Sequence, residues 1–187
     1  MKTLGLAIFV LLASSLTSLA QKVEVNRAAS SVKWTGKKIG GSHHGAINLK
    51  SGYLEFNNDQ ITGGKVIIDM NSLSNEDLED EGYNQKLVGH LKSDDFFGVD
   101  KFPYSSFEVT SATKFSNGKA TVSGKLSIKG KTENISFDVV KNGSAYIAKV
   151  DVDRSKFDVR YGSDSFFDNL GDKVIDDIFT LDIKLQL

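Results

Sequence analysis

The sequence contains no cysteine, a single proline and no run of basic residues. Without cysteine the chain can form neither a disulfide nor a thioether link to a lipid, so its core alone must stabilise the fold. The 23 Lys and Arg side chains nearly balance the 24 Asp and Glu side chains, which leaves a formal net charge of −1. This balance argues against nucleic acid as a partner. We also find no internal repeat and no linker that would divide the mature chain.

Residues 1–20 have the pattern of a secretory signal peptide. Lys2 precedes an apolar run from Leu4 to Leu12, and small and polar residues follow up to Ala20. This order is typical of signal peptides, and the apolar run is shorter than the roughly 20 residues of a membrane-spanning helix. We therefore expect cleavage after Ala20, a periplasmic or secreted protein with no membrane span after cleavage, and one mature domain over residues 21–187.

Most of the mature domain alternates apolar and polar residues with a period of two, as strands with one wet face do. The cleanest run is 180–187, and others lie at 32–35, 46–49, 53–56, 61–70, 107–110, 122–128, 135–139 and 146–152. We expect turns at 50–52 and 57–60, and hairpins at Asn117-Gly118, Lys129-Gly130 and Asn142-Gly143. Asn-Gly is a strong hairpin signal because both residues accept positive φ. The pattern predicts about eight antiparallel strands.

Two stretches interrupt the alternation. In 71–95, Ser74 to Asp77 has the residues of a helix N-terminus, with Leu78, Leu87 and Leu91 as apolar positions. In 157–171, Tyr161, Phe166 and Phe167 lie among glycines and aspartates. Both stretches are candidates for lids over a barrel mouth. Pro103 predicts that the next strand starts at Tyr104, because the residue before a proline favours extended geometry.

Closing such strands into an up-and-down barrel removes exposed edges and leaves room for one ligand. A two-sheet sandwich would show similar alternation, so periodicity alone leaves both folds open. The twelve phenylalanines, five tyrosines and Trp34 are consistent with a ligand pore, but on residue type alone they favour an ordinary core.

The polar residues give no sign of catalysis or metal binding. His43 and His44 are adjacent, so in a strand their side chains point to opposite faces. The third histidine is His90, and no expected helix carries two histidines four residues apart that could bind the same metal ion. The acidic run 76–81 lacks the central glycine of a calcium loop and indicates a solvated face. No Gly-x-Ser-x-Gly elbow, phosphate-binding glycine loop or cysteine nucleophile occurs. We expect no enzyme, no metal and no cofactor.

The segment His90 to Phe97, followed by Val99 to Pro103, closely resembles the signature of the YceI-like family of polyisoprenoid-binding proteins. Segments 124–139, 153–157 and 170–174 fit the same family, so the resemblance covers nearly all of the mature chain. It implies an all-β fold: a single extended, eight-stranded antiparallel up-and-down barrel, lipocalin-like, with one or two short helical insertions and a long apolar pore.

The resemblance also implies a function. The pore would hold a polyisoprenoid or an isoprenoid quinone for transport or storage, with the polar head near the mouth, and the protein can form a homodimer. Two alternatives stay open: a lipid-modifying enzyme in the same barrel, and an exported stress or structural protein without a ligand. The head-group candidates are His90, Lys92, Arg154 and Arg160. The candidates for the apolar pore are Trp34, Phe56, Leu87, Leu91, Phe96, Phe97, Phe102, Phe107, Val109, Leu126, Ile128, Phe137, Phe157 and Phe166.

Overall fold

The structure is a computed structural model and describes residues 20–187. The expected signal peptide lies outside the described residues, and the cleavage site stays a prediction. No helix in the described part of the chain is long and apolar enough to cross a membrane.

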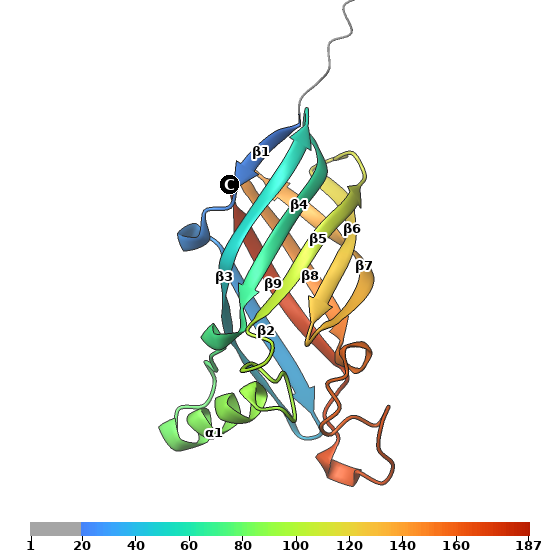
Figure 1. The fold of residues 1–187 in the computed structure, drawn as a ribbon. Coiled ribbons are helices and arrows are strands. Elements are labelled where there is room, and N and C mark those ends of the chain that lie inside the picture. The colour runs from blue at the N-terminus through green and yellow to red at the C-terminus, as the bar shows by residue number, and fades with distance from the viewer. Residues whose placement is uncertain (1–19) are drawn as a thin grey trace, which may run out of the picture.

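Eight antiparallel strands close into a barrel, as Figure 1 shows. Each strand from β2 to β9 pairs with the next one in the chain, and β9 pairs with β2. This closure confirms the predicted barrel in place of a sandwich. The strands are β2 (Ser31–Lys38), β3 (Gly41–Asn57), β4 (Gln60–Asp69), β5 (Tyr104–Ala112), β6 (Lys119–Ile128), β7 (Lys131–Asn142), β8 (Ala145–Asp153) and β9 (Ile178–Gln186). The sequence pattern did not reveal a ninth strand, β1 (Gln21–Glu24), which pairs with β3. The short helix η1 (Arg27–Ala29) connects β1 to β2.

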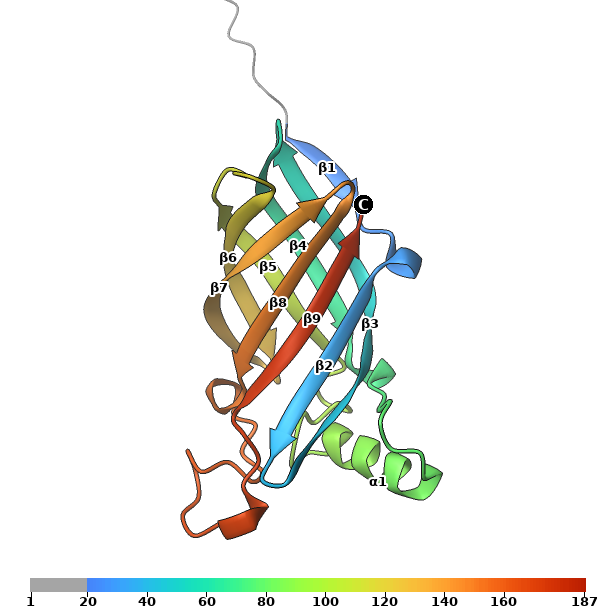
Figure 2. The same ribbon diagram turned by 180° about the vertical axis from the view of Figure 1, so that it is seen from behind.

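The two ends of the barrel differ in their connections (Figures 1 and 2). At the end that we call the hairpin end, short loops join β3 to β4, β5 to β6 and β7 to β8. The opposite end, the helix end, carries both long insertions. Residues 70–103 contain η2 (Met70–Ser72) and α1 (Glu81–Lys92), and residues 154–177 contain η3 (Arg154–Phe157) and η4 (Gly171–Lys173). Both predicted interruptions thus lie at the same end.

Strand β3 is continuous where a turn at 50–52 was expected, so that prediction was wrong. A bulge lies between Leu49 and Ser51 in the pairing with β4. Before the bulge, Ile47 and Leu49 are buried, and after it Leu54 and Phe56 are buried. A bulge adds one residue to one strand and so reverses which parity faces inward. In the sequence, this reversal looks like the end of one strand and the start of another.

Helix α1 begins later than the sequence indicated. Its N-cap is Asp80, whose side chain accepts a hydrogen bond of 2.9 Å from the Tyr83 backbone N–H. Ser74 and Glu76, which were expected in the first turn of the helix, instead pair with strand β3. Their backbone N–H groups donate to the carbonyls of Ala46 and His44, at 3.0 and 2.9 Å.

This pairing covers the edge of β3 beyond the end of β4. The local sequence around Ser74 favours a helix start, but it contains no information about the free carbonyls of β3 with which this segment pairs. Gly45 allows the close approach, because a Cβ built there would lie 1.9 Å from the Ser74 carbonyl oxygen.

The hairpin predictions are confirmed in two cases and corrected in the third. Asn117-Gly118 and Lys129-Gly130 have positive φ at both positions. Between β7 and β8, however, Asn142 is the last residue of its strand, and the loop is Gly143-Ser144 with φ of 60° at Gly143. Glycine as the first of two loop residues is the pattern of a type II′ turn. Strand β5 begins at Tyr104, directly after Pro103, as predicted.

Candidate ligand-binding cavity

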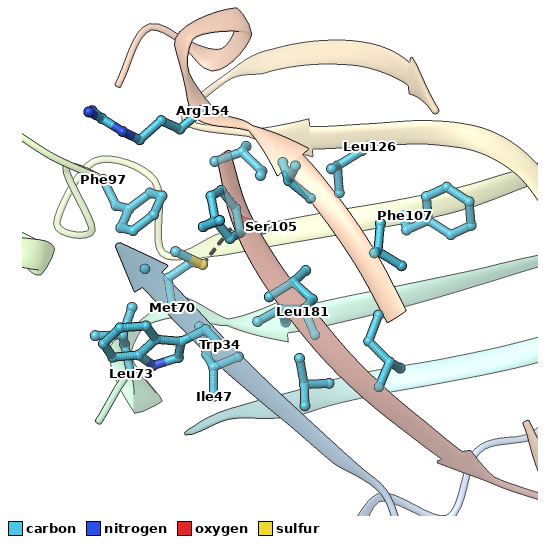
Figure 3. Close-up of a pocket in the computed structure, with 18 of the residues that line it drawn as sticks. Trp34, Ile47, Met70, Leu73, Phe97, Ser105, Phe107, Leu126, Arg154 and Leu181 are labelled. Carbon is cyan, nitrogen blue, oxygen red and sulfur yellow. Dashed lines mark hydrogen bonds between the residues drawn. The ribbon is translucent and has the colours of Figure 1, made fainter. Parts of the chain in front are cut away.

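The inward faces of the barrel strands surround a cavity of about 400 Å³ (Figure 3). This volume lies within the range of about 300–1,000 Å³ found for small-molecule sites. Most lining side chains are aliphatic or aromatic, such as Ile47, Leu126 and Leu181. Ser105 is a polar exception in the wall, and its hydroxyl donates to the sulfur of Met70 at 3.1 Å. A wall of this composition suits an apolar ligand.

Aromatic rings pack together near the hairpin end. The ring centroid of Tyr146 lies 5.9 Å from that of Phe56 and 6.0 Å from that of Phe115. Phe56 and Tyr146 are both buried, and burial raises the pKa of the Tyr146 phenol. The phenol therefore stays neutral at physiological pH. The Lys141 ammonium lies 5.9 Å from the Phe115 ring centroid and pairs with Asp59 at 3.4 Å, but neither residue lines the cavity.

Apart from Tyr146, the charged and titratable residues that line the cavity lie at the helix end. Strands β2 and β3, helix α1 and the second insertion each contribute to this group. Its members are Lys37, Lys38, His43, His90, Arg154, Tyr161 and Asp176. The cavity therefore has an apolar end and a polar end.

Arg154 is the most buried charge of this group, with 2% of its surface exposed. Its N–H groups make four hydrogen bonds and one ion pair within the second insertion. They donate to the backbone carbonyls of Val159, Tyr161, Ile175 and Asp176 at 2.8–3.1 Å and face the Asp177 carboxylate at 3.2 Å. Burial lowers the pKa of Arg154, and nearby carboxylates, led by Asp177, oppose that shift. The guanidinium thus organises the insertion, and backbone carbonyls take up four of its five N–H groups.

His43 faces the cavity and is oriented by Asp77. Its Nδ1 lies 2.8 Å from one carboxylate oxygen of Asp77, while the other oxygen accepts from the His44 backbone N–H at 2.8 Å and from Asn75. Partial burial favours a higher pKa for Asp77, but these hydrogen bonds outweigh it and hold the pKa below its usual value. The carboxylate is therefore ionised and accepts Nδ1–H, which leaves Nε2 as the ring atom available to a ligand.

His90 joins the two insertions across the helix end. Its ring makes an edge contact with Tyr161 at a centroid distance of 4.3 Å, and a second with Phe96 at 5.9 Å. Among the described residues, neither the His90 ring nitrogens nor the Lys38 ammonium has a hydrogen-bond or ion-pair partner within the protein.

Ten of the fourteen predicted pore residues line the cavity. They are Trp34, Leu87, Leu91, Phe96, Phe97, Phe107, Val109, Leu126, Ile128 and Phe137. Phe56 belongs to the aromatic cluster described above, and Phe102 packs against the turn at Gly130. Phe157 is buried outside the cavity wall, and Phe166 is exposed beside Arg160.

Of the predicted head-group residues, only His90 and Arg154 line the cavity. Lys92 donates to the Asn71 carbonyl at 2.7 Å, and Arg160 pairs with Asp158 at 2.6 Å on the surface. The prediction missed Lys38 and His43. The alternation could have identified them, because Lys38 continues the inward parity of Val32 and Trp34, and His43 shares the parity of Ile47.

No three His, Asp or Glu side chains within residues 20–187 converge into a group that could hold a metal ion. The adjacent histidines do point to opposite faces of β3, as expected, since His43 lines the cavity and His44 is exposed. Of the acidic run 76–81, two members have structural roles: Asp77 orients His43, and Asp80 caps α1.

Comparison with known families identifies the fold. The model of the YceI-like domain matches residues 24–187, which is nearly all of the described chain. The chain belongs to the YceI-like family. A UPF0312 protein from Shewanella denitrificans is 28% identical over 127 residues, which cover 67% of this chain and 64% of that protein. The alignment thus spans just under two thirds of that relative's length. UPF0312 protein SA2479 from Staphylococcus aureus is 45% identical over 60 residues, 32% of either chain.

Solved structures show the same YceI-like barrel. BcnA from Burkholderia cenocepacia superposes with a TM-score of 0.68 at 24% identity, covering 86% of this chain and 98% of that one. A polyisoprenoid binding domain from Saccharophagus degradans, implicated in plant cell wall breakdown, superposes with a TM-score of 0.57 at 13% identity, covering 87% and 95%. At these identities the likeness concerns the fold.

Proposed function

We propose that this YceI-like protein holds one elongated apolar lipid, a polyisoprenoid or an isoprenoid quinone, in its barrel and carries or stores it after export. The observation that carries this proposal is a closed barrel around a cavity with an apolar wall and a single polar end. Family membership supports it, as does the structural relative described as a polyisoprenoid binding domain. The proposal includes no catalytic step.

The hydrophobic effect alone provides enough free energy. Burial of one carbon contributes about 0.8 kcal/mol, so one five-carbon prenyl unit contributes about 4 kcal/mol. Association costs several kcal/mol in lost freedom of motion and chain ordering. Three buried prenyl units, at about 12 kcal/mol before those costs, are therefore sufficient for a dissociation constant in the micromolar range.

The distribution of polar groups gives the ligand a direction. The tail would lie toward the Phe56, Phe115 and Tyr146 cluster, which contains no charge. The head would lie at the helix end, where Lys38, His43 and His90 have polar atoms without a partner among residues 20–187. Arg154, which donates four hydrogen bonds to backbone carbonyls, would shape this end by holding the second insertion in place.

Isothermal titration calorimetry with geranylgeraniol, a 20-carbon prenyl alcohol, tests the proposal. We expect a dissociation constant in the micromolar range or below and a negative heat-capacity change, which marks burial of apolar surface. The test variant is Leu126→Trp, whose larger side chain fills part of the cavity (Figure 3). It should weaken binding at least tenfold. An unaltered far-UV spectrum would show that the variant is folded. Absence of binding, or equal binding by both proteins, would refute the proposed site.

A further inference from the structure

The barrel wall is incomplete between β7 and β8. Only four residue pairs join these strands, from Val139 opposite Ala148 to Asn142 opposite Ala145. Every other pair of neighbouring barrel strands has a longer ladder, from five pairs between β2 and β9 to ten between β6 and β7. Figure 2 shows β7 curving away from β8 toward the helix end. We call the unpaired part, residues 131–138 of β7 and 149–153 of β8, the β7–β8 seam.

Polar side chains on the outer face do not bridge the seam. On β7, Asp138 accepts a hydrogen bond from Thr121 at 2.8 Å, which draws it toward β6. On β8, Asp151 accepts from Thr180 at 2.6 Å, which draws it toward β9. Among the described residues, no hydrogen bond or ion pair joins the two sides of the seam. Below it, the Lys129 ammonium donates to the Asp158 carbonyl at 3.1 Å and limits the opening.

On the inner face, apolar side chains alone separate the seam from the cavity. Ile135 and Phe137 extend from β7, and Val150 and Val152 from β8, and all four line the cavity. Val150 and Val152 are buried, whereas Ile135 and Phe137 keep some exposure. In the part of the chain that the structure describes, no hydrogen bond joins these four residues across the seam, and the cavity lies directly behind them.

Both ends of the barrel are held more firmly. At the helix end, Arg154 makes four hydrogen bonds to backbone carbonyls, and the Trp34 indole N–H donates to the Ser74 carbonyl at 2.9 Å. At the hairpin end, the rings of Phe56, Phe115 and Tyr146 pack together. Local opening requires least free energy where the fewest bonds must break. In this barrel that place is the seam.

We propose that the lipid chain enters and leaves the barrel sideways through the β7–β8 seam. Transient separation of β7 from β8 opens the cavity along its side. A long lipid chain can then pass through the wall along its whole length while both ends of the barrel stay closed. This inference rests on the proposed lipid-binding function, and its failure can be told apart from the failure of that function.

The test bridges the seam with a removable cross-link. Extending the register of the four existing pairs places Ser136 opposite Asp151, both exposed on the outer face. Because the chain has no cysteine, Ser136→Cys with Asp151→Cys provides the only reactive thiols, which a short disulfide-containing bismaleimide can join. The control pair is Lys149→Cys with Asp182→Cys, which are partners in the intact ladder between β8 and β9.

The readout is the exchange of bound geranylgeraniol for its deuterated form, followed by native mass spectrometry. We expect the bridged seam to slow exchange at least tenfold, with recovery once reductant cleaves the linker, and the bridged control pair to leave the rate unchanged. If the bridged seam exchanges at the parental rate, the sideways route is wrong. If the protein takes up no geranylgeraniol, the proposed function fails together with the route.

A measurement on the unmodified protein provides an independent check. Amide hydrogen exchange should be faster at 131–138 and 149–153 than in the fully paired central parts of β6 and β9, because the N–H groups on the seam side of both segments have no ladder partner. Equal protection of these segments would overturn the proposal even if the cysteine variants failed to fold.

Discussion

Replacement of Arg154 by Met should cause the largest loss of stability of any single change at the helix end. The substitution removes the partner of four backbone carbonyls and the counter-charge of Asp177, whose side chain is only 14% exposed. Breaking a buried ion pair by removing one partner costs about 3–5 kcal/mol. The four carbonyls regain hydrogen bonds from water when the insertion moves outward, so we add no further cost for them. We therefore expect a loss of about 3–5 kcal/mol in the free energy of unfolding.

Urea unfolding followed by the fluorescence of Trp34, the sole tryptophan, measures this loss. Arg154→Lys should fall between the parent and Arg154→Met, because an ammonium keeps the charge but cannot reproduce the planar set of donors. Lys149→Met is the matched control on β8, since Lys149 is exposed and the change should stay within about 0.5 kcal/mol. A loss below about 1 kcal/mol for Arg154→Met would refute the role assigned to this residue.

Two further predictions concern the segment that covers the edge of β3. Gly45→Ala places a Cβ 1.9 Å from the Ser74 carbonyl oxygen and should lower the free energy of unfolding by about 1–3 kcal/mol, measured by thermal unfolding. The control is Gly89→Ala on α1, where a Cβ meets open space. It should be neutral or stabilise the protein by up to about 1 kcal/mol. Equal effects of the two alanines would contradict the close approach at Gly45. The second prediction is a pH dependence. Folding lowers the pKa of Asp77 below 3.8, so the ionised carboxylate stabilises the fold at pH values above 3.8. This stabilisation is lost as the pH falls through the pKa of the folded state. Asp77→Asn should therefore destabilise the protein at pH 7, and the difference in unfolding free energy should shrink in acid, whereas a constant difference from pH 7 to pH 3 would contradict this assignment.

The fold was predictable from the sequence because each barrel strand has one solvent-exposed face and one buried face. Apolar and polar residues therefore alternate along each strand with a period of two. Features that depend on neighbouring strands were not predictable. The bulge after Leu49 looks like a turn until the partner strand is known, and the segment at Ser74 has a helix signal that pairing with β3 overrides. The short ladder between β7 and β8 leaves no mark in the alternation of either strand.

The candidate site was predictable in part for the same reason. Inward parity identifies Trp34, Phe107, Leu126 and similar wall residues, and it would also have identified Lys38. It cannot show that Arg154 donates four hydrogen bonds to backbone carbonyls, because those carbonyls belong to residues up to 22 positions away. Nor can it show that Phe157 is buried outside the cavity wall.

The most direct test of the lipid-binding account is native mass spectrometry of the protein purified gently from its own host, followed by organic extraction of whatever is bound. If the barrel holds one lipid, each chain should carry one bound species that extracts as a polyprenyl or quinone lipid. A protein that is recovered empty and also takes up no added geranylgeraniol would contradict it.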